Sequence, residues 1–187
     1  MTISEIRKAT VAVRDLDLAR RYYETTFDYI SHGEADVAGT GYESLWNMPA
    51  GMTGKAALLG PAGATTGLLQ LVQFDQPGKR IWGDYQHPEN YGHYALNIRV
   101  PKFQPAIDKI LEHGGRSKAK PTHWTVSAEI SAWDSLSYDP DGNILDVFEL
   151  EPAPGSLLAA YDGRCSSLQT VALHVSDARR SARFYAV

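Results

Sequence analysis

The chain has 187 residues, of which 43% are hydrophobic and 21% are charged, and its formal net charge is −4. This composition supports one packed domain or two small halves that share a core. Charges of both signs are spread along the chain without a long basic run, which argues against a nucleic acid partner.

The cysteine content and the apolar segments indicate the cellular compartment of the protein. Its one cysteine, Cys165, cannot form an internal disulfide and fits a reducing compartment. The N-terminal residues lack the pattern of a signal peptide. No apolar run approaches the roughly 18 residues that span a membrane. We therefore expect a cytoplasmic protein with no membrane partner.

The first predicted unit begins with a strand and a helix. Alternate residues are apolar, at Ala9, Val11 and Val13. The opposite strand face carries Lys8, Thr10 and Ala12. Asp15 is placed to cap a helix by accepting its free backbone N–H groups, and Tyr22 and Tyr23 fall on one side of that helix. Three further strands are expected at Tyr42–Trp46, Lys55–Leu59 and Gly67–Phe74.

A second, more distant copy of this pattern begins at His93. Apolar residues alternate at Tyr94, Leu96, Ile98 and Val100, and Phe103 to Leu111 follow helical spacing. Further strands are expected at Trp124–Ala128, Ser135–Tyr138 and Ile144–Leu150. The residues Asp139-Pro-Asp-Gly-Asn143 form a turn by their chemistry and predict a hairpin between the last two strands.

A third start repeats the first one closely. Residues Val171 to Tyr185 match Ala9 to Tyr23 at a constant offset of 162 without a gap, so Asp177 matches Asp15 and Tyr185 matches Tyr23. The sequence therefore predicts an α+β chain organised as residues 1–76, a linker at 77–91, residues 92–151, a linker at 152–167, and an incomplete third unit at 168–187.

Two segments resemble the vicinal oxygen chelate superfamily, the relatives of glyoxalases, bleomycin-resistance proteins and ring-cleaving dioxygenases. They are Val11-Ala-Val-Arg-Asp15 through Tyr23, and Ser137-Tyr-Asp-Pro-Asp-Gly-Asn-Ile-Leu-Asp-Val-Phe-Glu149. The resemblance implies paired βαβββ modules that form a cupped mixed sheet with helices on the outer face. It also implies a small-molecule substrate in the cup, often bound by a divalent metal such as Fe, Mn, Zn or Ni.

The resemblance implies site residues at particular positions. The first ligand position falls on Lys8, which cannot ligate a metal while protonated, and the corresponding carboxylate position falls on Gln70. In the second unit Asp146 takes the carboxylate position, four residues after Gly142. Its flanks, Leu145 and Val147, are apolar, so Asp146 is expected to point into the cup. His93 takes the ligand position if Ile98 sets the register, and Ala95 takes it if Val100 does.

From these positions we predict His93 and Asp146 as metal ligands and Lys8 as a catalytic group that holds an anionic oxygen, or as an ion-pair partner of Asp146. Predicted binding residues on the same strand faces are Thr10, Gln70, Asn97 and Arg99. The leading function is a metal-assisted lyase or dioxygenase with an atypical site, and enzymatic activity itself stays open.

Two other readings stay open at this point. The chain is either a non-catalytic binder of the bleomycin-resistance kind or the structural half of a longer four-module enzyme. A homodimer or that longer chain would cover the third unit, because one strand and one helix cannot bury an apolar face alone. We therefore expect Leu168–Val187 to be poorly ordered or packed on a second subunit.

Overall fold

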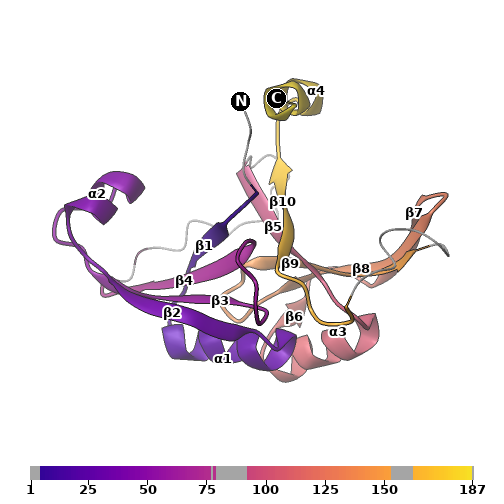
Figure 1. Cartoon of the computed structure of the whole chain (residues 1–187), viewed down its shortest axis with the longest axis horizontal. Helices are drawn as coiled ribbons and strands as arrows, with labels where there is room; N and C mark the ends of the chain where they lie inside the picture. Colours follow the sequence, from indigo (N-terminus) through magenta and orange to yellow (C-terminus); the bar gives the residue numbers. More distant parts are fainter. Residues whose placement is uncertain (1–4, 77, 79–91, 153–161, 187) are drawn as a thin grey trace.

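The computed structural model describes residues 5–76, 78, 92–152 and 162–186. Within this part of the chain, the first sheet has the strand order β1-β4-β3-β2, with bounds Lys8–Ala12, Leu68–Phe74, Gly54–Gly60 and Ile30–Val37. Strand β1 runs parallel to β4, whereas β3 is antiparallel to both β4 and β2. Helix α1 (Leu16–Phe27) packs on one face of this sheet (Figure 1).

The second sheet has the order β10-β5-β9-β8-β6, with bounds Leu168–His174, Gly92–Arg99, Ile144–Pro152, Ile130–Tyr138 and Arg116–Ser117. Strand β7 (Thr122–Ser127) pairs with β8 beside this path. Strand β5 runs parallel to β9, as β1 does to β4. Helix α3 (Phe103–Glu112) lies beside α1 below the two sheets (Figure 1). The predicted α+β architecture is therefore confirmed.

One apolar core joins the two sheets through the layer of helices. It includes Tyr23 of α1, Leu69 of β4, Ile110 of α3 and Leu145 of β9, all of which are fully buried. Burial of such side chains contributes about 1.5–3 kcal/mol each. We call the face of each sheet that points away from α1 and α3 its cup face.

A buried hydrogen bond also connects the two halves. The hydroxyl of Tyr23 donates to Oδ2 of Asp139 over 2.8 Å, and the backbone N–H of Asn143 donates to Oδ1 of the same carboxylate over 2.7 Å. Asp139 therefore stabilises the predicted turn and also binds helix α1 of the first half. Burial raises the pKa of Asp139, while these hydrogen bonds act in the opposite direction.

The predicted helix caps are present. The carboxylate of Asp15 accepts from the backbone N–H of Leu18, and that of Asp177 accepts from the N–H of Arg180, each over 2.9 Å. Both aspartates have extended backbones, as N-cap residues do.

Two elements of the first sheet differ from the prediction. The expected strand at Tyr42–Trp46 is instead helix α2 (Thr40–Trp46), because Tyr42 and Trp46 have i, i+4 spacing and both pack on the cup face around Val72. Helix α2 thus lies on the opposite side of the sheet from α1. Strand β2 was not predicted, since its sequence ISHGEADV lacks apolar alternation and most of it is exposed at a sheet edge.

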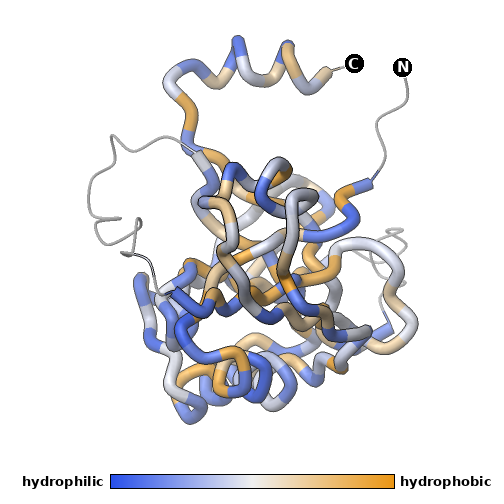
Figure 2. Tube along the Cα trace, turned by 90° about the vertical axis from the view of Figure 1, so that its left-hand side faces the viewer, coloured by the Kyte–Doolittle hydropathy of each residue, from blue (hydrophilic) through white to orange (hydrophobic). Residues whose placement is uncertain are grey.

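The third unit was expected to be poorly ordered or packed on a second subunit, and this is wrong for its strand. Strand β10 pairs antiparallel with β5 of the same chain, and the backbone N–H of Leu168 donates to the carbonyl oxygen of Gly67 over 2.8 Å. Helix α4 (Ala178–Tyr185) follows and stands away from the body of the molecule (Figure 2). The predicted linkers 77–91 and 152–167 lie largely outside the described residues. No helix among the described residues is long and apolar enough to cross a membrane.

Candidate functional site

The cup face of the second sheet brings Asn97 and Asp146 together. Strands β5 and β9 are paired in parallel, with Asn97 opposite Asp146. The residues that flank Asp146 in the sequence, Leu145 and Val147, are fully buried in the core. Because side chains alternate along a strand, Asp146 projects onto the cup face, as predicted from its apolar flanks.

A second carboxylate, Asp134, reaches the same place from β8. Asp134 forms a side-chain hydrogen bond with Asp146, although it lies one diagonal position away across the antiparallel β8–β9 pair. Burial, followed by the hydrogen bond and the charge of Asp134, raises the pKa of Asp146 to about 7. The carboxyl group of Asp146 therefore gains or loses its proton near neutral pH.

Two oxygen atoms of this cluster are buried without a hydrogen-bond partner among the described residues: Oδ1 of Asn97 and Oδ1 of Asp146. A buried acceptor without a donor costs about 1–3 kcal/mol. The cluster therefore has unused hydrogen-bonding capacity, and both oxygens are shielded from solvent.

The first sheet has polar side chains at the equivalent positions, and these form a hydrogen bond with each other. Thr10 lies opposite Gln70 in the parallel β1–β4 pair, and its hydroxyl donates to Oε1 of Gln70 over 3.0 Å. Thr10 and Asn97 each lie five residues before the N-cap residue of the following helix. The two modules thus place equivalent pairs, Thr10–Gln70 and Asn97–Asp146, on their cup faces. In the second pair, one side-chain oxygen of each residue lacks a hydrogen-bond partner among the described residues.

The structure does not bring His93 and Asp146 together. Helix α3 has Lys102 at its N-cap, which makes Val100 the counterpart of Val13 and places Ala95 at the ligand position. His93 is exposed at the start of β5, and four residues of strand, about 13 Å, separate it from Asn97.

The predicted ligands therefore do not fit a metal centre built on His93 and Asp146. No group of three or more His, Cys, Asp or Glu side chains in the described part of the chain could hold a metal ion. Lys8 is exposed in the other sheet, and no charge of Lys8 acts on the pKa of Asp146. The alternative of a Lys8–Asp146 ion pair is wrong.

Arg99, the last predicted binding residue, is buried at the end of β5. Its backbone N–H donates to Oγ of Ser166, and its carbonyl oxygen accepts from the N–H of the same residue. Arg99 thereby holds the segment that leads into β10.

Asp134 is the candidate site residue that sequence reasoning missed. The strand was predicted to begin at Ser135, whereas β8 begins at Ile130. With the longer strand, the alternation from Ala132 to Tyr138 would have placed Asp134 on the face of Leu136, which lies opposite Asp146.

No protein-family model matches the sequence, and a search of curated proteins found no match. Solved structures match its fold. A glyoxalase family protein from Bacillus cereus is similar at a TM-score of 0.65 and 13% identity, over 80% of this chain and 96% of that one. Glyoxalase I from Zea mays is similar at 0.59 and 19% identity, over 97% of this chain and 53% of that one. A glyoxylase/bleomycin resistance protein/dioxygenase domain from Frankia sp. EAN1pec is similar at 0.53 and 15% identity, over 80% of this chain and 100% of that one.

These likenesses establish the fold alone. The chain has the vicinal oxygen chelate fold, as the sequence resemblance predicted, and it spans about half the length of the maize protein.

Proposed function

We propose that this chain, which has the vicinal oxygen chelate fold, is a lyase-type enzyme that moves a proton on a small oxygen-rich molecule at the cup face of its second sheet. Asp146 is the proton-transfer group, and Asp134 and Asn97 position it. The observation that carries the proposal is the pair of neighbouring carboxyl groups, Asp134 and Asp146, beside Asn97 on one cup face.

The raised pKa of Asp146 supports this role. General acid–base catalysis is most effective when the pKa of the group lies near the working pH, and the pKa of Asp146 is about 7. An ordinary exposed aspartate is too weak a base at that pH. The neighbouring carboxylate and the partial burial supply the perturbation, as they do at many catalytic sites.

The proposed step is proton abstraction beside a carbonyl group. The ionised carboxylate of Asp146 takes a proton from the carbon, the C–H electron pair moves into the enolate, and the proton returns from Asp146 to the neighbouring carbon or oxygen. Asn97, which lies opposite Asp146 in the β5–β9 pair, positions the carboxyl group beside the substrate. No part of this step uses a metal or an oxidant.

The remaining predicted residues have supporting roles in the proposal. On the first sheet, the ammonium group of Lys8 donates a hydrogen bond to an anionic group of the bound molecule. The hydrogen-bonded Thr10–Gln70 pair forms a polar surface on the same strand face. The oxidative alternative has less support, because the described residues do not assemble the two histidines and one carboxylate typical of iron oxygenases.

Hydrogen exchange into a small α-hydroxyketone tests the proposal. With hydroxyacetone in D₂O, proton NMR reports the loss of the carbon-bound hydrogen beside the carbonyl. We expect exchange that accelerates as the pH rises through about 7, is abolished by Asp146→Asn and is retained by Asp36→Asn, which removes an exposed carboxylate from β2.

Equal rates for the wild type and Asp146→Asn would overturn the proposal. Saturable binding of hydroxyacetone without exchange would favour the non-catalytic binder.

A further inference from the structure

Two basic side chains meet on one aromatic ring at the β6 edge of the second sheet. The guanidinium carbon of Arg116 lies 4.6 Å from the centre of the Tyr138 ring, and Nζ of Lys118 lies 5.4 Å from it. Nζ of Lys118 also donates a hydrogen bond to the hydroxyl oxygen of Tyr138 over 3.2 Å. Contacts of this kind hold a positive charge in place without neutralising it.

The two charges have no counter-ion in the described part of the chain. The ion pairs between described residues involve other cations than Arg116 and Lys118. Neither charge acts on the pKa of Asp146, which responds to burial and to Asp134. Because the two cations repel each other across one ring, an anion bound between them is attracted by both.

Strand pairing places these cations on the cup face, close to Asp146. Arg116 lies opposite Tyr138 in the β6–β8 pair, and the backbone N–H of Lys118 donates to the carbonyl oxygen of Leu136. Leu136 in turn lies opposite Asp146 of β9. Tyr138 and Leu136 are two residues apart on β8, so their side chains share the face of Asp146.

The spacing suits a short molecule. Strand β8 lies between β6 and β9, so the backbones of these two strands are about 10 Å apart. Side chains that project from one face keep roughly this spacing, and hydrogen bonds of about 3 Å at each end leave roughly 4 Å between them. One or two carbon atoms between a carbonyl group and an anionic group fill that distance.

We propose that Arg116, Lys118 and Tyr138 bind the phosphate group of a small phosphorylated hydroxyketone whose carbonyl end lies at Asp146. The proposal names the substrate class of the proposed function and rests on it. A phosphate monoester carries about −1.5 to −2 charges at neutral pH, which matches two cations better than a carboxylate does. The guanidinium of Arg116 binds two phosphate oxygens, and Tyr138 accepts from Lys118 and donates its own O–H group to the phosphate.

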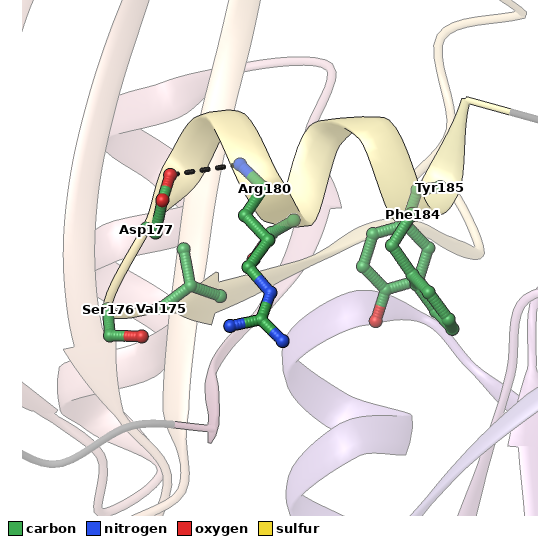
Figure 3. Close-up of a pocket in the computed structure, with 7 residues that line it drawn as sticks. Val175, Ser176, Asp177, Arg180, Phe184 and Tyr185 are labelled. Carbon is green, nitrogen blue, oxygen red and sulfur yellow. Dashed lines mark hydrogen bonds between the residues drawn. The ribbon is translucent and has the colours of Figure 1, made fainter.

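Two basic residues elsewhere provide matched controls. Lys120 follows Lys118 in the same segment and is exposed. Arg180, which is also exposed, projects from α4 into a groove of about 280 Å³ that is lined by residues 175–185 (Figure 3). Replacing either residue by glutamine removes one positive charge from a place that the proposal does not use.

Titration calorimetry with inorganic phosphate tests the anion site without any catalysis. We expect saturable binding to the wild type, with a Kd that rises at least tenfold in Arg116→Gln and in Lys118→Gln. The Kd should change less than twofold in Lys120→Gln and Arg180→Gln. Equal weakening in all four variants would overturn the proposal, because phosphate would then respond to surface charge in general. Absence of saturable binding to the wild type would overturn it as well.

A second titration tests whether the phosphate site adjoins Asp146. The side-chain amide signals of Asn97, which lies opposite Asp146, are followed by ¹⁵N NMR as hydroxyacetone phosphate is added. We expect these signals to shift, and Arg116→Gln to need at least tenfold more of the ester for the same shift. Binding of the ester that leaves the Asn97 signals in place would contradict the proposal.

Neither titration depends on proton transfer. A failure of the exchange test with hydroxyacetone would therefore refute the proposed function and leave both binding results intact, whereas a failure of these titrations would refute the phosphate site alone.

Discussion

Replacing Asp146 by asparagine should make the free energy of unfolding less sensitive to pH. Below pH 3.8 this carboxyl is protonated in both the folded and the unfolded chain. Between 3.8 and about 7 the unfolded chain releases the proton and the folded chain keeps it, so the folded state loses stability as the pH rises. Asparagine has a similar shape and no proton to release, so the variant lacks this loss.

The size of the effect follows from the raised pKa. A carboxyl pKa moved from 3.8 to about 7 corresponds to roughly 4 kcal/mol at about 1.4 kcal/mol per pH unit. Asp146 is only partly buried, and solvent screening reduces this figure to about 2 kcal/mol. Only the part of this loss between pH 5 and about 7 falls in the range from pH 5 to pH 8, so relative to wild type Asp146→Asn should be about 1.3 kcal/mol more stable at pH 8 than at pH 5.

Urea unfolding at pH 5, 6, 7 and 8 measures this difference for the wild type, Asp146→Asn and Asp36→Asn. Other titrating groups contribute equally to all three proteins and cancel in the comparison. Free energies of unfolding that run parallel across the pH range for the wild type and Asp146→Asn would refute the raised pKa of Asp146.

Five further substitutions test a hydrogen bond between the halves, a close backbone contact and the two helix caps. Tyr23→Phe should lower the free energy of unfolding by about 1–3 kcal/mol, with a larger loss at high pH because the lost hydrogen bond stabilises a charged carboxylate; a loss that is independent of pH would contradict this. Gly67→Ala should destabilise by about 1–3 kcal/mol, because φ is +63° and a Cβ would lie 2.6 Å from the first carbonyl oxygen of β10, whereas Gly63→Ala meets nothing within 4 Å at φ +80° and should cost less in the same urea experiment. Asp15→Ala should cost about 1 kcal/mol of global stability, while Asp177→Ala should speed hydrogen exchange in α4 and leave the urea midpoint unchanged, and a shift of that midpoint would show that α4 belongs to the cooperative core.

The cup-face residues show how far pattern reasoning reaches. Apolar alternation placed Asp146 on the correct face of β9 because its flanks, Leu145 and Val147, had to enter the core. The same reasoning placed Thr10 on the cup face, where it forms a hydrogen bond with Gln70, the residue that the family resemblance put at the carboxylate position. Alternation works here because one face of each strand is packed on a helix.

Pattern reasoning failed where neither sheet face was clearly apolar. Strand β2 is polar on both faces, and its identity depends on pairing with β3, which is remote from it in the sequence. Helix α2 has aromatic residues whose spacing suits a short strand as well as one turn of helix, and contact with Val72 decides between them.

The sequence by itself determined the repeat of strand and helix, the capping aspartates, the turn at 139–143 and hence the fold, because these depend on local propensity and on periodic burial. Only the tertiary structure decided which polar groups meet. Asp134 and Asp146 come from different strands, and their contact and the raised pKa of Asp146 depend on the register of β8 against β9. The helix start at Lys102 likewise fixed the register of β5 and separated His93 from Asp146, since a shift of one strand position changes both the face and the neighbours of a side chain.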